Sequence, residues 1–125
     1  MAQPGRDIFG RRTAIVVDDD GRIRTIMERA LEADGFRVLS APDGREALRL
    51  LSQEDYVDVV VADVQMPHLD GRMLAAHLAE RDRVPPILFV SGYESPAPGV
   101  LPGPFLAKPF TAEELRRRVR HLLGG

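Results

Sequence analysis

The chain has 125 residues, 44% of them apolar and 29% charged, a composition typical of one globular domain and not of a disordered segment. Its formal net charge of −2 gives no overall attraction to nucleic acid or to an acidic membrane. The absence of cysteine excludes disulfides, thiol catalysis and thiolate metal sites, and it fits a reducing compartment. No apolar run is long enough to span a membrane, and the N-terminus lacks the apolar region of a signal peptide. We therefore expect a cytoplasmic protein with no membrane insertion.

Residues 1–11 are mostly polar and include glycine and proline, so we expect a flexible tail ahead of one domain over residues 12–123. Within that domain, short β-branched runs alternate with segments of helical periodicity. The continuous apolar runs at 13–17 and 57–63 indicate strands covered on both faces, as in a parallel sheet. The alternating run at 36–41 indicates a half-exposed strand, at an edge. The five expected strands are 13–17, 36–41, 57–63, 86–91 and 105–108.

Apolar residues recur at helical spacing between most of these strands. The first such segment predicts a helix from Arg22 to Asp34 that ends at Gly35. The residues expected to face the core from the first helix are Ile23, Ile26, Met27, Ala30 and Leu31, and those from the later helices are Ala47, Leu48, Leu51, Met73, Leu74, Leu78, Leu115, Val119, Leu122 and Leu123. The side chains expected to cap helices are Asp20, Asp43, Asp70 and Thr111. This order of elements predicts an α/β fold with a mostly parallel sheet and right-handed crossovers.

Polar side chains follow directly after the expected strands. The first strand is followed by three acids, Asp18 to Asp20, and the third ends in Asp63. The fourth ends in Ser91, and the fifth ends in Lys108. Because ligands bind outside the carboxyl ends of parallel strands, we expect these groups to share one edge of the sheet.

Carboxylates crowded in this way repel one another, and a hard cation can neutralise them. Oxygen ligands without histidine or cysteine favour Mg²⁺, Ca²⁺ or Mn²⁺ over Zn²⁺, and a few carboxylates with room for water and phosphate suit Mg²⁺ best. Lys108 can then neutralise one phosphate oxygen, Ser91 can donate to another, and a carboxylate can attack phosphorus. The residues alone predict a magnesium-dependent phosphoryl site whose acceptor is an aspartate.

Four motifs, in this order and spacing, resemble the receiver domain of two-component response regulators: IVVDDD, VVVADVQMPHLDG, ILFVSGY and FLAKPF. The resemblance covers residues 12 to 123, and the four motifs together are far more specific than any one of them. It implies a doubly wound, five-stranded parallel sheet in the order 2-1-3-4-5, the CheY-like or flavodoxin-like fold. It also implies a phosphoacceptor switch, which transfers and loses its own phosphoryl group but is not an enzyme acting on free substrates.

The resemblance assigns roles to individual positions. Asp63 matches the phosphoacceptor, and Asp18 and Asp19 match the acidic pair that organises Mg²⁺. Gln65 matches the position whose backbone carbonyl completes the protein ligands of the metal. The implied partner is a histidine kinase or a histidine phosphotransfer protein that carries phosphohistidine, with an unknown output protein and no direct nucleic-acid contact.

The remaining matches concern the switch. Lys108 matches the family's invariant lysine, and Pro109 matches a proline that follows a cis peptide bond. Ser91 matches the hydroxyl residue that turns toward the phosphoryl group, and Phe105 matches the aromatic switch position. In this interpretation Phe105 fills the space that Ser91 leaves, so a local change in charge alters the protein surface.

Other conspicuous residues favour ordinary roles. Asp20 is expected to cap the first helix rather than to bind metal. The histidines share no metal-ligand spacing and are expected at the surface. Tyr93 either lies at the mouth of the site, slowing the access of water, or is an ordinary exposed ring. The last helix carries Arg116, Arg117, Arg118 and Arg120, which form either a solvated face or, as in many receivers, a docking face for a partner.

The chain departs from the family between Ser91 and Lys108. This segment is short and contains Pro96, Pro98, Pro102 and Pro104. We therefore expect the helix between the fourth and fifth strands to be shortened or absent, which also places the usual dimer of the family in doubt. The chain ends soon after the last helix, so we expect a single-domain response regulator, with a receiver cut from a hybrid histidine kinase as the alternative.

Two other function classes compete with the receiver. A magnesium-dependent phosphohydrolase acting through Asp63 would often carry a second acid two residues later, but Gln65 stands there. A receiver-like interaction module that no longer accepts phosphate would not need the full set of Asp18, Asp19, Asp63, Ser91 and Lys108. Both alternatives are therefore less well supported by the residues.

Overall fold

The computed structural model describes residues 8–64, 71–92 and 103–124. Its strands form one parallel sheet in the order β2-β1-β3-β4-β5, which confirms the expected fold class. The strands are β1 (Thr13–Val17), β2 (Arg37–Ala41), β3 (Val59–Asp63), β4 (Ile87–Ser91) and β5 (Phe105–Ala107). Strand β2 is an edge strand and is half-buried over most of its length, as its alternating sequence predicts.

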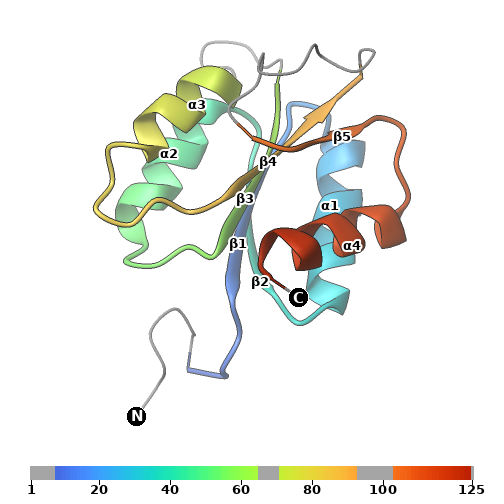
Figure 1. Cartoon of the computed structure of the whole chain (residues 1–125), viewed down its shortest axis with the longest axis horizontal. Coiled ribbons are helices and arrows are strands. Elements are labelled where there is room, and N and C mark those ends of the chain that lie inside the picture. Colours follow the sequence, from blue (N-terminus) through green and yellow to red (C-terminus); the bar gives the residue numbers. More distant parts are fainter. Residues whose placement is uncertain (1–7, 65–70, 93–102, 125) are drawn as a thin grey trace.

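Helices cover both faces of the sheet (Figure 1). The helices of the described ranges are α1 (Gly21–Ala33), α2 (Gly44–Gln53), α3 (Gly71–Leu78) and α4 (Ala112–Leu122). Helices α1 and α4 lie on one face of the sheet, and α2 and α3 lie on the other (Figure 1). Within the described part of the chain, no helix combines the length and apolar character needed to cross a bilayer.

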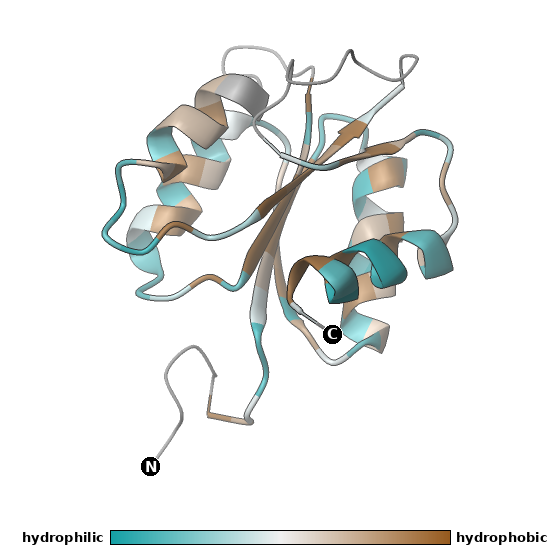
Figure 2. Ribbon diagram, in the orientation of Figure 1, coloured by the Kyte–Doolittle hydropathy of each residue, from teal (hydrophilic) through white to brown (hydrophobic). Residues whose placement is uncertain are grey.

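The two faces of the sheet bury separate apolar clusters, because successive side chains of a strand point to opposite sides. From β1, Ala14 and Val16 pack toward α1 and α4, whereas Ile15 and Val17 pack toward α2 and α3. The central strands are accordingly apolar on both faces (Figure 2). A rigid two-sided core therefore carries the polar ends of the strands.

Local signals set the helix ends as expected. The carboxylate of Asp20 accepts from the backbone amides of Arg22 and Ile23, which caps α1 and holds the pKa of Asp20 below its usual value. At the other end of α1, Gly35 has φ +88°, a left-handed conformation that favours glycine. Thr111 caps α4 with a complete capping box.

Some expectations about boundaries and burial are wrong. The third strand begins at Val59 rather than at residue 57, and just before it Asp58 exchanges hydrogen bonds with the backbone of Thr13. Ile26 and Met73, expected to face the core, are 42% and 48% exposed. In α1 and α3 the packed stripe is therefore narrower than the apolar stripe in the sequence, since the neighbouring elements decide how much of it is covered.

Three expectations about the fold lie outside the described residues. The shortened or absent helix between the fourth and fifth strands falls on residues 93–102, the flexible tail falls largely on residues 1–7, and the cap at Asp70 falls in the range 65–70. These remain predictions.

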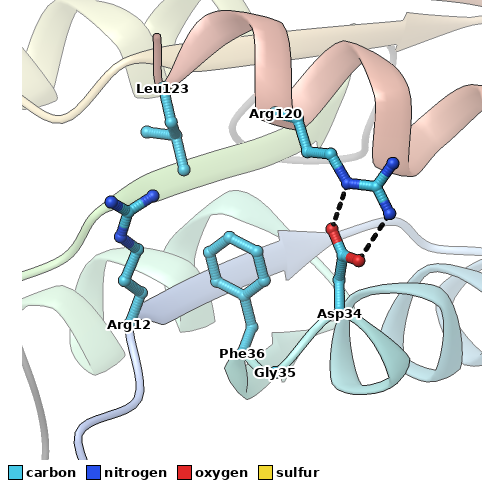
Figure 3. A pocket seen from close by; sticks show the side chains of 6 residues that line it. All are labelled: Arg12, Asp34, Gly35, Phe36, Arg120 and Leu123. Atoms are coloured by element: carbon cyan, nitrogen blue, oxygen red, sulfur yellow. Dashed lines mark hydrogen bonds and ion pairs between the residues drawn. The ribbon is translucent and has the colours of Figure 1, made fainter. Parts of the chain in front are cut away.

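A cavity of about 230 Å³ lies between the start of β1 and the ends of α1 and α4. It is lined by Arg12, Phe36 and Leu123, and by an ion pair in which Arg120 donates two hydrogen bonds to Asp34 (Figure 3). This pair joins residues 86 positions apart and ties α4 to the end of α1. It also holds the pKa of the Asp34 carboxyl below its usual value, through the hydrogen bonds and the charge of Arg120.

Candidate phosphoryl and metal site

The register of the sheet brings the strand-end side chains together. Val17 of β1 pairs with Ala62 of β3. The next residues along the chain are Asp18 and Asp63, which therefore also lie side by side. On the other side of β3, Ser91 pairs with Ala107, which places Lys108 one residue beyond the end of β5. The expected grouping of Asp18, Asp63, Ser91 and Lys108 at one edge of the sheet is therefore what the structure shows.

Lys108 is the cation of this group. Its ammonium nitrogen lies 2.9 Å from Oδ2 of Asp18 and 3.0 Å from Oδ2 of Asp63. The side chain of Lys108 is only 18% exposed. Burial acts to lower its pKa, but the two carboxylates outweigh burial, and the pKa stands above its usual value. Lys108 therefore stays protonated and joins the ends of β1, β3 and β5.

Asp18 is the most enclosed acid of the site. It is fully buried, and its Oδ1 accepts a hydrogen bond of 2.9 Å from the backbone amide of Asp20. Its Oδ2 pairs with the ammonium of Lys108 at 2.9 Å. Burial raises the pKa of the Asp18 carboxyl above its usual value, although Lys108 and the amide of Asp20 act in the opposite direction.

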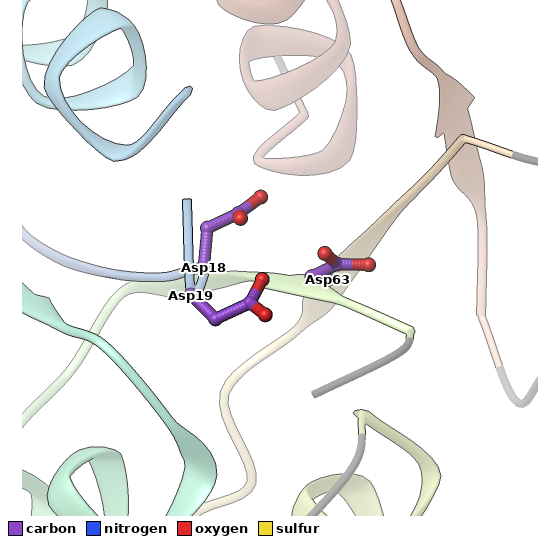
Figure 4. Close-up of side chains that lie close together, drawn as sticks. All are labelled: Asp18, Asp19 and Asp63. Atoms are coloured by element: carbon purple, nitrogen blue, oxygen red, sulfur yellow. The ribbon is translucent and has the colours of Figure 1, made fainter. Parts of the chain in front are cut away.

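Asp19 completes a cluster of three carboxylates with Asp18 and Asp63 (Figure 4). One oxygen from each lies within 4.8 Å of the others, and Asp19 is exposed while the other two are buried. Lys108 contacts two of the three carboxylates, Asp18 and Asp63. An all-oxygen donor set of three clustered carboxylates fits a hard divalent cation such as Mg²⁺.

The other predicted residues of the site are placed as follows. Ser91 is buried, and its carbonyl accepts a 2.7 Å hydrogen bond from the backbone amide of Lys108. Phe105 is half-buried in β5, opposite Phe89 of β4. The peptide bond between Lys108 and Pro109 is cis, as the resemblance implies. Gln65 and Tyr93 lie outside the described residues.

Two arginines make contacts with this region that were not predicted from the sequence. Arg24 of α1 donates a hydrogen bond of 2.8 Å to the backbone carbonyl of Asp18. Arg118 of α4 donates one of 3.3 Å to the backbone carbonyl of Phe105. Each arginine donates to a backbone carbonyl, which every residue has. A sequence pattern therefore could not reveal either contact.

Comparison with known families identifies the class of protein. The family model of the response regulator receiver domain matches residues 14–120, and the chain belongs to this family. Receiver domains are phosphoacceptor switches of two-component signalling, and phosphorylation and Mg²⁺ binding are typical of them.

Individual relatives agree with this class. The response regulator MprA of Mycolicibacterium vanbaalenii is 40% identical over 114 residues, which are 87% of this chain and 49% of MprA. The sensor kinase CckA of Brucella abortus is 35% identical over 123 residues, 94% of this chain and 13% of the kinase. The chain thus spans half or less of the length of these relatives.

Solved structures show the same fold. The chemotaxis response regulator CheY4 of Vibrio cholerae superposes with a TM-score of 0.81 at 29% identity, covering 90% of this chain and 99% of CheY4. The receiver domain from the hybrid histidine kinase CckA gives a TM-score of 0.77 at 33% identity, covering 89% of this chain and 98% of that domain. Receivers from free-standing regulators and from kinases are therefore both similar to this chain.

Proposed function

We propose that this chain accepts a phosphoryl group from a phosphohistidine onto Asp63, in a reaction that requires Mg²⁺, and thereby changes its surface for a partner. The observation that carries the proposal is the cluster of Asp18, Asp19 and Asp63 at the carboxyl ends of β1 and β3, with Lys108 in contact with two of its members. Desolvation offsets much of the attraction in a buried cluster of charges, so stability alone explains this arrangement poorly.

In this proposal, the carboxylates of Asp18, Asp19 and Asp63 hold Mg²⁺, and the backbone carbonyl of Gln65 contributes a further ligand. When bound, the ion offsets negative charge on the phosphoryl oxygens and orients them for in-line transfer. The buried carboxylate of Asp18, which pairs with Lys108 in the metal-free protein, would also bind the ion in this state.

The side chains of the protein account for the remaining chemistry. A carboxylate oxygen of Asp63 attacks phosphorus, forming a P–O bond while the P–N bond of the phosphohistidine breaks and the imidazole leaves with the bonding electron pair. The ammonium of Lys108, now 3.0 Å from Asp63, is positioned to offset charge on the transferred group. Hydrolysis of the resulting acyl phosphate by water returns Asp63 to its carboxylate form, so the protein turns over only its own phosphoryl group.

The proposed switch passes from Ser91 to Phe105. The hydroxyl of Ser91 donates to a phosphoryl oxygen, and the ring of Phe105 moves into the space beside it. Arg118 gives this movement a route to the surface, because it joins the backbone of Phe105 to α4. Helix α4 also exposes Arg117, which makes its outer face a candidate docking surface for an acidic partner.

The proposal treats residues 12–123 as the receiver and residues 1–11 as a tail, and it places the phosphotransfer in the cytoplasm. The similarity to a response regulator and to a sensor kinase supports a histidine kinase or a histidine phosphotransfer protein as the partner. It supports a single-domain regulator and a receiver from a hybrid kinase alike. No contact with nucleic acid is part of the proposal.

The experiment that tests the proposal is intact-mass spectrometry after incubation with acetyl phosphate. We expect one phosphoryl adduct on the wild-type chain with Mg²⁺, and none after chelation or in Asp63→Asn. Turnover of generic phosphate esters would instead support a phosphohydrolase. Mg²⁺ binding without an adduct, from acetyl phosphate or from a phosphorylated histidine protein, would support an interaction module that signals without phosphate.

A further inference from the structure

The turn between β1 and α1 presents two of the three clustered carboxylates. Its main chain is held on one side by the amide of Asp18, which donates to the carbonyl of Ala41 in β2 at 3.2 Å. The amide of Asp20 donates to the side chain of Asp18, and the side chain of Asp20 caps α1. These contacts leave one main-chain group of Asp18 to be satisfied, its carbonyl oxygen.

That carbonyl is paired by a side chain rather than by the sheet. Strand β1 ends at Val17, and no backbone amide of the described residues donates to the carbonyl of Asp18. The Nη1 of Arg24 donates to it at 2.8 Å. Asp18 is fully buried in the intact chain, so its carbonyl depends on Arg24 for a donor, and leaving it unpaired would be unfavourable.

We propose that Arg24 is a positioning residue for the divalent cation: it fixes the main chain of Asp18, so that the carboxylates of Asp18 and Asp19 are arranged before the ion arrives. This inference rests on the proposed magnesium site. Arg24 is half-buried and lies near the start of α1. Its guanidinium reaches back from the helix to the backbone carbonyl of Asp18, just after the end of β1. Outer partners that orient metal ligands in this way commonly change metal affinity by about 10- to 100-fold.

The positive charge of Arg24 by itself disfavours the binding of a cation nearby. The direction in which Mg²⁺ affinity changes when Arg24 is replaced therefore distinguishes positioning from charge repulsion. A cation next to the cluster repels a divalent ion, so loss of the guanidinium would strengthen Mg²⁺ binding if charge were its main contribution. If positioning dominates, the same loss weakens Mg²⁺ binding. We expect the dissociation constant of Arg24→Gln to rise about 10-fold, the low end of the usual range for an outer partner.

The test is calorimetric titration of MgCl₂ into the metal-free full chain, well below the unfolding temperature, for wild type, Arg24→Gln, Arg24→Lys and Arg29→Gln. Arg29 is exposed on the same helix and serves as the matched control. We expect weaker binding in Arg24→Gln, partial recovery in Arg24→Lys, which keeps a donor and the charge, and no change in Arg29→Gln. Amide exchange of Asp20, measured without metal, should be faster in Arg24→Gln, since its acceptor on Asp18 is no longer held.

The outcomes separate this inference from the proposed function. Wild-type binding with equal or tighter binding in Arg24→Gln overturns the role of Arg24 and leaves the magnesium site standing. A purely structural role would lower the unfolding temperature of Arg24→Gln without changing its dissociation constant, and that result also overturns the inference. Failure of the wild-type chain to bind Mg²⁺ overturns both.

Discussion

Replacement of Lys108 by methionine tests the electrostatics of the site most severely. Lys108→Met keeps an unbranched apolar stem and removes the ammonium that lies 2.9 Å from Asp18 and 3.0 Å from Asp63. At an effective dielectric constant of about 20, two unit charges about 3 Å apart attract by about 5.5 kcal/mol, and desolvation of the ammonium offsets much of this. Removal of one partner of a buried ion pair lowers the free energy of unfolding by about 3–5 kcal/mol. Because Lys108 is partly exposed, we expect a loss of about 3 kcal/mol in Lys108→Met near pH 7.

The pH dependence of this loss provides an internal check. The pKa of Asp18 is raised in the folded wild-type protein because burial outweighs Lys108 and the amide of Asp20. When folding raises the pKa of a carboxyl, that group stabilises the folded state only while it is protonated. The full stabilisation is present below the pKa of the unfolded state, and it is lost as the pH rises through the pKa of the folded state. Without Lys108 the pKa of Asp18 rises further, so the destabilisation should shrink as the pH falls from neutrality toward the usual range of a carboxyl.

Urea unfolding of the metal-free protein measures the effect. Mg²⁺ should restore part of the stability lost in Lys108→Met, since it neutralises the same carboxylates. Arg49→Met, which removes an exposed ion pair with Glu46 on α2, is the control and should change little. A loss below about 1 kcal/mol in Lys108→Met, or a loss that neither acid nor Mg²⁺ reduces, would refute the reasoning.

Three further predictions concern other parts of the fold. Leu115→Ala should lower the free energy of unfolding by about 2–5 kcal/mol, because Leu115 is fully buried between α4 and the sheet; a loss within the error of urea unfolding would contradict this. Arg117→Glu should weaken binding of the output partner in a pull-down or calorimetric assay while leaving the phosphoryl adduct unchanged, and unchanged binding would remove α4 as the docking surface. Amide exchange over residues 93–103 should be fast, since the expected helix is shortened or absent, and slow exchange over two or more turns would show that the prediction is wrong.

Much of the site could be predicted because its residues follow strands that are easy to recognise. The apolar runs before Asp18 and Asp63 predict buried parallel strands, and the carboxyl ends of such strands share one edge. The two ends of α1 were equally predictable, because Asp20 at its start and Gly35 after its end act through the local backbone. Local chemistry and strand register were sufficient for these features.

Contacts that depend on tertiary geometry were not predictable in the same way. Arg24 reaches a main-chain carbonyl, and Arg120 pairs with Asp34 across the fold, so neither contact leaves a periodic pattern in the sequence. Ile26 and Met73 have the right spacing for the core but lie beyond the area that neighbouring elements cover. Helical periodicity reports the direction of an apolar face, and only the packed structure defines its width.

The most direct test of the central claim is to locate the phosphoryl group. After phosphorylation with acetyl phosphate and Mg²⁺, borohydride reduction converts an acyl phosphate of aspartate to homoserine, and peptide sequencing by mass spectrometry identifies the reduced position. The account predicts homoserine at residue 63, with none when Mg²⁺ is chelated. Reduction at Asp18 or Asp19 instead, or a phosphoryl adduct that resists borohydride, would contradict the assignment of Asp63 as the acceptor.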